Sequence, residues 1–216
     1  WNAKTGEHRA RLDFHVASIT GAAFTPDNAS LFTSSVDKLV CPWDLRDPMG
    51  VKPIEGRVLK HSQPVNSIAL KSEGDLLVSG CEDGQLQVWD LSSLEYKPIH
   101  RARPAETAGP RNVNSVSLSL DGRWLIAVDS QNDEATLFDL TTLKERLVLP
   151  LRARDAIGWS ASFVPEKAPD PVQESPRFVT VGGDEARMWN SQGTELASFS
   201  PHRPIAFVDL SPPDGR

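Results

Sequence analysis

Short runs of alternating apolar and polar residues recur along the whole chain, and each ends in turn-forming residues. Residues 65–70 and 113–118 show the alternation most clearly. A period of two is typical of β-strands, and no stretch has a convincing helical period. The intervening turns are rich in Asp, Asn, Gly and Pro, which accept the backbone geometry of tight hairpins. The pattern predicts an all-β protein made of short antiparallel strands.

An aromatic residue followed by Asp or Asn ends one strand-like run in every repeat. These pairs begin at Trp1, Trp43, Trp89, Phe138 and Trp189, so their spacings are 42, 46, 49 and 51 residues. Three strands lead up to each pair from Trp43 onward, and we expect a fourth strand afterwards, at residues 53–60, 96–100, 146–151 and 195–199. Four short strands in every 40–45 residues or so are typical of a β-propeller blade. A single blade cannot bury both faces, so neighbouring blades must stack.

The repeat divides the chain into four complete blades and two partial ones. We predict complete blades at residues 15–60, 61–100, 109–151 and 154–199. Residues 1–14 would belong to a preceding blade. Residues 202–216 would begin a further blade, with His202 before a first strand at Ile205–Leu210. The chain opens on Trp1-Asn2, in the middle of a repeat and without an initiator methionine, which favours a fragment of a larger ring.

Two repeats carry the same polar and aromatic residues at the same spacing. In both, an Asp follows a hydroxyl residue by four positions, and a Trp follows that Asp by six. These repeats resemble the WD-repeat family, in which a His, a Ser or Thr, an Asp and a Trp form a hydrogen-bonded tetrad. The resemblance covers essentially the whole chain and implies a β-propeller. The tetrad positions are His15, Thr33, Asp37 and Trp43, and His61, Ser79, Asp83 and Trp89.

The other two repeats depart from this pattern. In the third, we place Gly109, Val128, Asn132 and Phe138 at the four positions, so no tetrad is expected. The fourth keeps Trp189, but Asp184 lies one residue too close and no His precedes the first strand. The family usually builds closed rings, most often of seven blades, which would leave about two blades missing here. A closed five-bladed ring and an open arc with exposed strand edges are the alternatives.

Residues that could carry catalysis or hold a metal have simpler explanations. His61, Ser79 and Asp83 have the residue types of a hydrolase triad, but the set recurs at His15, Thr33 and Asp37 and no nucleophile-elbow motif is present. Cys41 and Cys81 fall in different repeats and are expected to be reduced, half-buried thiols. Histidine pairs at metal-ligand spacing are missing, and residues 181–184 lack the Lys of a phosphate loop. We therefore expect no catalytic residue, metal or cofactor.

Charge and composition narrow the class of partner. The 216 residues carry a formal net charge of -6, which argues against a broad nucleic-acid or membrane footprint. No apolar run reaches the roughly 18–20 residues of a membrane span. We predict a cytoplasmic, non-catalytic platform that binds other proteins rather than a small-molecule substrate. The alternative is a propeller-supported enzyme or a regulatory domain of a larger multidomain signalling protein.

The family resemblance also suggests where partners would bind. Propellers present side chains on the rim, and the face that carries the tetrad loops is a frequent docking surface in the family. The loops at residues 99–112 and 165–176 exceed ordinary blade connections. Residues 43–46 resemble the W-D-x-R box of cullin-ligase substrate receptors, although Arg46 could simply pair with Asp44 or Asp47. The candidate partner-binding residues are Val36, Gln63, Glu82, Gln131 and Arg154.

Overall fold

The computed structural model of the chain describes residues 2, 4–8, 10–47, 51–93, 97–102, 112–151, 158–165, 176–201, 203 and 205–208. Over residues 97–102 it describes the path of the backbone alone. Every secondary-structure element assigned within these residues is a β-strand, so the predicted all-β class is confirmed.

The strands form four antiparallel sheets, each built from consecutive strands. Blade one contains β1 (Ile19–Phe24), β2 (Ser30–Ser35), β3 (Leu39–Asp44), β4 (Lys52–Pro53) and β5 (Leu59–Lys60). Blade two contains β6 (Val65–Leu70), β7 (Leu76–Cys81), β8 (Leu86–Asp90) and β9 (Lys97–Ala102). Blade three contains β10 (Val113–Leu118), β11 (Trp124–Asp129), β12 (Glu134–Asp139) and β13 (Lys144–Pro150). Blade four contains β14 (Trp159–Phe163), β15 (Phe178–Gly182), β16 (Glu185–Trp189) and β17 (Glu195–Phe199).

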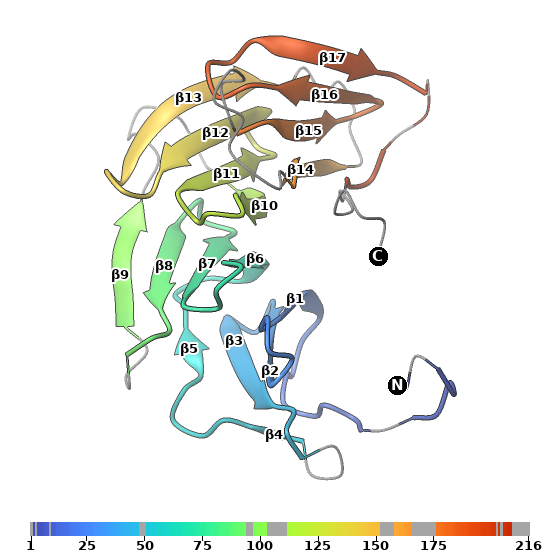
Figure 1. The fold of residues 1–216 in the computed structure, drawn as a ribbon, viewed down its shortest axis with the longest axis vertical. Helices are drawn as coiled ribbons and strands as arrows, with labels where there is room; N and C mark the ends of the chain where they lie inside the picture. Colours follow the sequence, from blue (N-terminus) through green and yellow to red (C-terminus); the bar gives the residue numbers. More distant parts are fainter. Residues whose placement is uncertain are drawn as a thin grey trace.

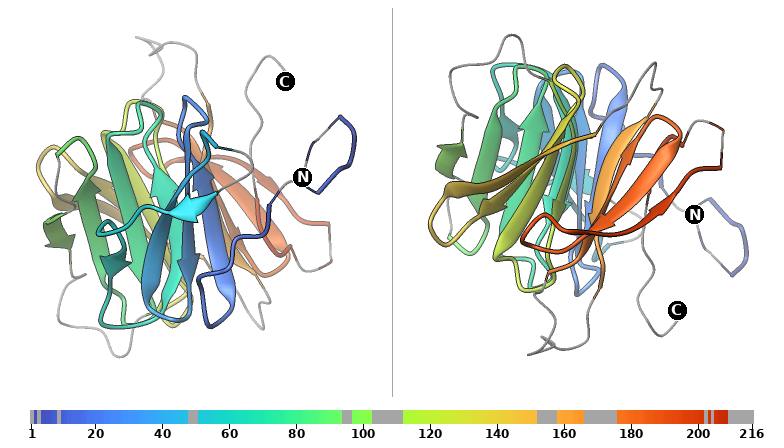
Figure 2. Two further views of the ribbon diagram at one scale, coloured as in Figure 1. Left: turned by 90° about the horizontal axis from the view of Figure 1, so that it is seen from below. Right: turned by 90° about the horizontal axis from the view of Figure 1, so that it is seen from above.

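The four blades are arranged side by side in an open arc (Figure 1). The first strand of each blade lies on the inner side of the arc, and the fourth lies on its outer side. Views at right angles show the blades standing next to one another, with their strands crossing the thickness of the arc (Figure 2). This arrangement confirms the predicted β-propeller of four-stranded blades. Because the arc stays open over the described residues, they do not form the closed five-bladed ring.

The outer strand of blade one differs from the expected continuous strand at residues 53–60. Two short strands, β4 and β5, both pair with β3. Gly56, between them, has a φ of 73°, which an extended strand cannot contain. The outer edge of this sheet is therefore divided into two pieces by a turn.

The hairpin turns between the second and third strands share one backbone feature. Lys38, Gly84 and Asp133 are the last residues of their turns and Gly183 is the first residue of its shorter turn, and their φ values are 72°, 76°, 52° and 69°. Left-handed backbone geometry of this kind suits Gly, and Asp to a lesser degree, which explains the turn-forming residues seen in the sequence. These turns bring the end of each second strand back into pairing with the third.

Apolar residues hold each blade against the next. We call the side of a blade that meets the preceding blade its front, and the opposite side its back. Phe32, Val40 and Leu59 on the back of blade one pack against Leu77 and Trp89 on the front of blade two. The next two interfaces repeat this arrangement, with Phe138 and Trp189 on the fronts of blades three and four. Burying such side chains contributes roughly 1.5–3 kcal/mol each.

Hydrogen bonds also join neighbouring blades at their inner strands. The Thr20 hydroxyl donates to the Val65 carbonyl at 2.7 Å, and the Asn66 amide donates to the Val113 carbonyl at 3.1 Å. Both side chains lie at β-bulges, where the pairing of β1 with β2 and of β6 with β7 shifts by one residue. A bulge frees a residue from the ladder, and here its side chain reaches the next blade.

At three points the chain leaves one blade for the next through the same backbone bond. His61, Leu151 and Ile205 each donate their N–H to the turn residue between the second and third strands of the blade before, at 2.9, 2.7 and 2.8 Å. The acceptors are the carbonyls of Lys38, Asp133 and Gly183. Ile205 therefore lies where a further blade would begin. No strand is assigned at residues 205–208, and residues 209–210 fall outside the described part of the chain, so the expected strand at Ile205–Leu210 stays a prediction.

The start of the chain repeats a local feature of the complete blades. The Asn2 side chain accepts the N–H of Lys4, just as Asn190 accepts the N–H of Gln192. Asn2 thus makes the turn that follows the third strand elsewhere, although no strand is assigned among the described residues before Ile19. Leu12 packs against the front of blade one. The assignment of residues 1–14 to a preceding blade stays a prediction.

Candidate functional site

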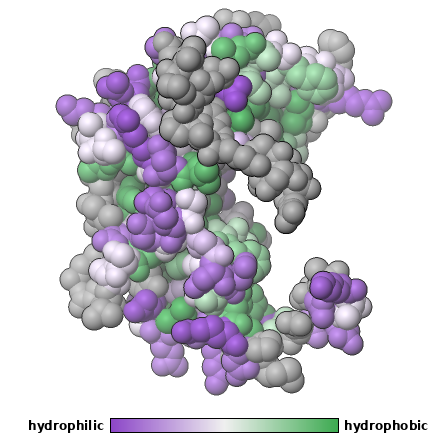
Figure 3. Space-filling view, in the orientation of Figure 1, coloured by the Kyte–Doolittle hydropathy of each residue, from purple (hydrophilic) through white to green (hydrophobic). Residues whose placement is uncertain are grey.

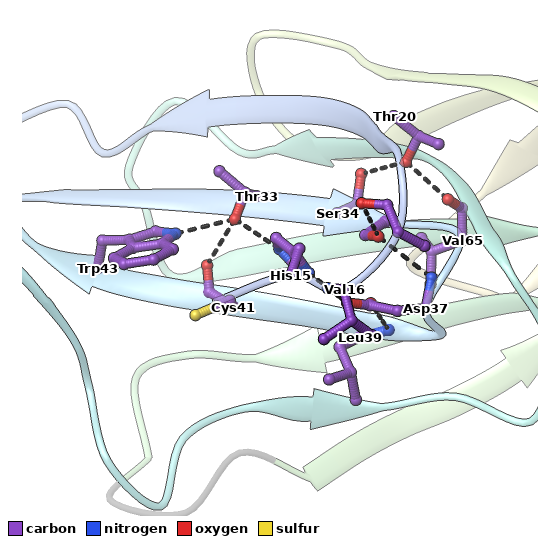
Figure 4. A network of polar contacts seen from close by, with 12 residues as sticks. His15, Val16, Thr20, Thr33, Ser34, Asp37, Leu39, Cys41, Trp43 and Val65 are labelled. Carbon is purple, nitrogen blue, oxygen red and sulfur yellow. Dashed lines mark hydrogen bonds and ion pairs between the residues drawn. The ribbon is translucent and has the colours of Figure 1, made fainter. Parts of the chain in front are cut away.

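Four side chains of blade one form a continuous hydrogen-bonded chain (Figure 4). Trp43, on β3, donates its indole N–H to Thr33 Oγ1 on β2 at 2.8 Å. Thr33 Oγ1 lies 2.8 Å from His15 Nε2, and His15 Nδ1 lies 2.9 Å from Asp37 Oδ2. The side chains of His15 and Asp37 are only 3% and 5% exposed. The structure thus brings together the four residues that the sequence placed in one tetrad.

The other hydrogen bonds of these four residues indicate which atoms donate and which accept. Asp37 also accepts the N–H groups of Val16 and Leu39, at 3.1 Å each. The Asp37 carboxylate can only accept, so His15 Nδ1–H donates to it, and Nε2 can accept from the Thr33 hydroxyl. Burial raises the pKa of Asp37, but the bonds from His15 and Val16 outweigh it and the net pKa is lowered. The ionised Asp37 therefore anchors the turn between β2 and β3 at neutral pH.

Blade two repeats the central part of this arrangement. His61 Nε2 lies 2.8 Å from Ser79 Oγ, which accepts the indole N–H of Trp89 at 3.2 Å. The His61 and Trp89 rings are 5.4 Å apart between centroids. Asp83 accepts the N–H of Gln85 at 3.1 Å within the following turn. The same residue types at the same spacing therefore give closely similar local structures in two blades.

Blade three requires a correction of one predicted position. Val128 was expected at the hydroxyl position, but the strand pairing gives that position to Ala127. Leu125 pairs with Phe138 as Leu77 pairs with Trp89, and the hydroxyl residue lies two positions after that Leu. The turn between β11 and β12 is one residue longer than its counterpart in blade two, so counting back from Asn132 gives the wrong residue. Neither Ala127 nor Phe138 can make the tetrad's hydrogen bonds.

Blade four contains a hydrogen bond that the sequence analysis missed. Trp189 donates its indole N–H to Thr180 Oγ1 at 2.9 Å, in a fully buried contact. The β15–β16 turn is one residue shorter than in blade two, so Thr180 precedes Trp189 by nine residues instead of ten. Its strand position, two residues after the apolar residue that pairs with the Trp, could have identified it. Asp184, in this turn, is exposed.

The predicted partner-binding residues lie next to these networks at one rim of the arc. Val36, Glu82 and Gln131 each occupy a turn between the second and third strands, and all three are exposed. Gln63 is exposed in the segment that enters blade two. Backbone bonds of 3.0 Å from Val36 to Ser18 and from Glu82 to Pro64 tie these turns to the entry segments. Arg154 lies outside the described residues.

Comparison with known proteins shows the same architecture. The family described as "WD domain, G-beta repeat" matches at residues 6–44 and 55–90, the two repeats that hold the hydrogen-bonded sets. The chain belongs to the WD-repeat family. A solved structure described as "Structure of U3-55K" superposes with a TM-score of 0.67 at 21% identity, over 89% of this chain and 55% of that chain.

Curated relatives carry WD repeats in different settings. The chain is 31% identical over 146 residues to WD repeat-containing protein 37 of Xenopus laevis. The matched region is 67% of this chain and 27% of the relative. It is 29% identical over 119 residues to the Target of rapamycin complex subunit wat1 of Schizosaccharomyces pombe, covering 55% of this chain and 35% of the relative. The chain therefore spans about a quarter to a third of these relatives.

Arg46, in the motif that resembles a W-D-x-R box, pairs with the carboxylate of Asp44. Its Nε and Nη2 donate to the two carboxylate oxygens at 2.8 and 2.6 Å. The hydrogen bonds of Arg46 lower the pKa of Asp44 to about 2. Both side chains are open to solvent, at 73% and 37%, so the pair contributes little to stability. This WD-repeat turn is held by its own ion pair.

The two cysteines of the WD-repeat chain are more buried than expected. Cys41 and Cys81 are 0% and 1% exposed, not half-buried. They fall in the apolar contacts on the fronts of blades one and two. Burial, with the nearby charge of Asp37, raises the pKa of the Cys41 thiol to about 12, so this thiol stays protonated and is a poor nucleophile.

Two other kinds of site are absent from the described residues. Within the described ranges, no group of three or more His, Cys, Asp or Glu residues is placed to hold a metal ion. In the same part of the chain, no helix is long and apolar enough to cross a membrane.

Proposed function

We propose that this WD-repeat chain is a non-catalytic platform that binds other proteins through the tetrad rim. We define the tetrad rim as the exposed turns and entry segment that hold Val36, Gln63, Glu82 and Gln131. We expect Arg154, which lies outside the described residues, to belong to it. The observation that supports this proposal is that exposed rim residues are adjacent to residues held by part-buried hydrogen bonds. Val36 directly precedes Asp37, which is bonded to His15, and Glu82 directly precedes Asp83, which accepts the N–H of Gln85.

A rigid rim favours protein binding because the side chains are held in place before the partner arrives. Less conformational entropy is then lost on association, and affinity rises without additional contacts. The residues are contributed by adjacent blades, so a partner that spans several of them would be recognised by their joint spacing. The Schizosaccharomyces pombe relative is described as a subunit of a complex, which fits a platform of this kind. We also propose a cytoplasmic location, in which the buried thiols of Cys41 and Cys81 remain reduced.

The proposal can be tested by comparing two double variants with matched chemistry. The first, Val36→Lys with Glu82→Lys, changes one apolar and one acidic residue on the tetrad rim. The control, Leu120→Lys with Glu73→Lys, makes the same changes in exposed turns at the other ends of the strands. The unmodified chain and the two double variants each serve as bait in quantitative capture from a cell extract.

We expect the rim variant to capture at least tenfold less partner protein than the unmodified chain. The control should capture as much as the unmodified chain. Equal capture by all three baits, or a loss in the control alone, would contradict binding through the tetrad rim. Circular dichroism of each variant checks that the fold is kept, since all four positions are exposed.

A further inference from the structure

Blade three lacks a tetrad, yet its rim turn is held by one buried carboxylate. Asp129 is the last residue of β11 and is 6% exposed. Its Oδ1 accepts the backbone N–H groups of Asn112, Gln131 and Asn132, at 3.2, 2.9 and 3.3 Å. Its Oδ2 accepts the side-chain amide of Asn132 at 2.9 Å. Hydrogen bonds to a carboxylate are stronger than those between neutral groups, so this one side chain anchors the whole turn.

The Asp129 carboxylate combines two functions that blade one divides between two residues. Ser35 ends β2 as Asp129 ends β11, and it accepts the N–H of Asp37 within the turn at 3.1 Å. Asp37 in turn accepts the N–H of Val16, in the segment that enters blade one. In blade three, Asp129 binds both the turn and the entry segment, the latter at Asn112. The anchoring carboxylate is thus displaced from the turn to the end of the strand.

The same hydrogen bonds reach blade two through the entry segment. The Asn66 side-chain amide, on β6, donates to Asn112 Oδ1 at 2.7 Å. The Asn112 N–H donates to Asp129, and the Ser130 N–H donates to the Asn112 carbonyl at 3.1 Å. Asn112 is thus bound on one side to blade two and on the other side to the rim turn of blade three. Gln131, which is exposed in this turn, is therefore connected to blade two by a continuous series of hydrogen bonds.

We propose that Asp129 is a positioning residue of the tetrad rim, which fixes Gln131 relative to blade two so that blades two and three bind one partner protein together. This inference rests on the proposed binding at the tetrad rim. Asp129 is buried, so it acts through Gln131 and not by touching the partner. Because hydrogen bonds are directional, a side chain whose turn is held in place binds with a smaller loss of conformational entropy.

Hydrogen exchange with deuterated solvent tests the positioning without any partner. In Asp129→Ala, the backbone N–H groups of Asn112, Gln131 and Asn132 should exchange about tenfold faster or more, because each loses a charged acceptor. The rates are measured by NMR on the whole chain. The N–H of Leu39, which Asp37 accepts in blade one, should keep its rate.

The matched control is Asp121→Ala, beyond the other end of β11. Asp121 is exposed and accepts the N–H of Arg123, two residues on, at 3.0 Å, just as Asp129 accepts that of Gln131. The turns of this opposite rim face the viewer in Figure 3, where hydrophilic residues predominate over blades one and two. The control removes the same chemical group from a rim outside the proposal, so exchange at Gln131 should not change.

A reciprocal exchange of two neighbouring side chains tests the anchor while keeping their sizes. Asn132→Asp alone places a second carboxylate against Asp129, where the amide now donates, so exchange at Gln131 should become faster. Adding Asp129→Asn again places an amide against a carboxylate, with donor and acceptor reversed. Its amide oxygen can still accept the backbone N–H groups. The double variant should therefore recover most of the protection that Asn132→Asp loses.

Partner binding then tests whether Asp129 acts through Gln131. The probe is the protein that the unmodified chain captures and the Val36→Lys, Glu82→Lys variant loses. Gln131→Ala and Asp129→Ala should each weaken its binding about fivefold or more. The double variant should bind no more weakly than either single variant, because Asp129 would then have no side chain to position. Thr180→Val removes a buried hydrogen bond in blade four and should leave the affinity unchanged, which controls for a general loss of stability.

Several outcomes would overturn the proposal. Unchanged exchange in Asp129→Ala, or no recovery in the reciprocal variant, would show that this carboxylate does not hold the turn. Additive losses of affinity for Asp129→Ala and Gln131→Ala would show that Asp129 does not act through Gln131. If no captured protein is lost in the Val36→Lys, Glu82→Lys variant, binding at the tetrad rim itself is refuted. Faster exchange in Asp129→Ala would then still establish the anchor, so the two failures are distinguishable.

Discussion

At the scale of single residues, one hydroxyl group decides whether a tetrad exists. Thr33 Oγ1 lies within hydrogen-bond distance of both the Trp43 indole and the His15 ring. In blade four, Thr180 serves one of these partners, Trp189. In blade three the equivalent residue is Ala127, and Phe138 brings no N–H that would need an acceptor. The hydroxyl and the indole are thus gained or lost together.

Replacing the hydroxyl by a methyl group tests this dependence. Thr33→Val keeps the shape but leaves the buried Trp43 indole N–H without its acceptor and His15 Nε2 without its hydroxyl partner. We expect a loss of about 1–3 kcal/mol in the free energy of unfolding, measured by denaturant titration. Thr180→Val should cost less, because one partner is lost instead of two. Equal losses, or none for Thr33→Val, would show that the hydrogen-bonded chain is not stabilising.

At the scale of elements, turn length decides how far the sequence can be interpreted. Alternation and turn residues predicted the strands well, because both reflect local backbone preferences. The hydroxyl positions of blades three and four were assigned wrongly or missed, because the turns differ by one residue and a fixed spacing then selects a neighbour. Val128 and Thr180 are the two examples. The strand pairing, which the sequence does not reveal, identifies the hydroxyl position in both blades.

One turn also contains a strained residue. Leu143, between β12 and β13, has a φ of 56°, whereas Gly193 has 83° at the equivalent turn of blade four. The left-handed region costs a residue with a side chain roughly 1–2 kcal/mol. Leu143→Gly should therefore raise the free energy of unfolding by about 0.5–1 kcal/mol, after the added flexibility of the unfolded chain is subtracted.

Thermal unfolding of two variants would check this expectation. Leu120→Gly is the matched control, because Leu120 is also an exposed turn leucine but is not among the residues with positive φ. It should lose stability or stay unchanged. A lower melting temperature for Leu143→Gly would mean that contacts of the leucine side chain outweigh the backbone strain.

At the scale of the whole molecule, stability comes from stacking one blade on the next. The stacking and the propeller class could be predicted from the repeat, because an isolated four-stranded sheet leaves both faces uncovered. The partner could not be predicted, because the fold does not constrain exposed residues such as Val36 and Glu82, and their identity alone does not specify what would bind there. The same holds for Arg154, whose role rests on family position.

The interface between blades two and three offers a test of stacking. A Cβ added at Gly80 would lie 2.4 Å from Val113 Cγ1 and 3.0 Å from Val116 Cγ1. Gly80→Ala should therefore force the blades apart and cost about 1–3 kcal/mol in unfolding free energy. Adding Val113→Ala removes the clashing methyl groups and should recover part of the loss. A double-mutant cycle without any coupling would contradict direct contact at this point.

The backbone bonds that His61, Leu151 and Ile205 donate bear on the order of synthesis. The acceptors on Lys38, Asp133 and Gly183 belong to hairpins that are complete before the donor residue is made. A ribosome adds about 5–20 residues per second, so each blade has several seconds to fold before the next is finished. At these three points the nascent chain thus meets an acceptor that is already in place, and assembly can proceed in the direction of translation, one blade upon another.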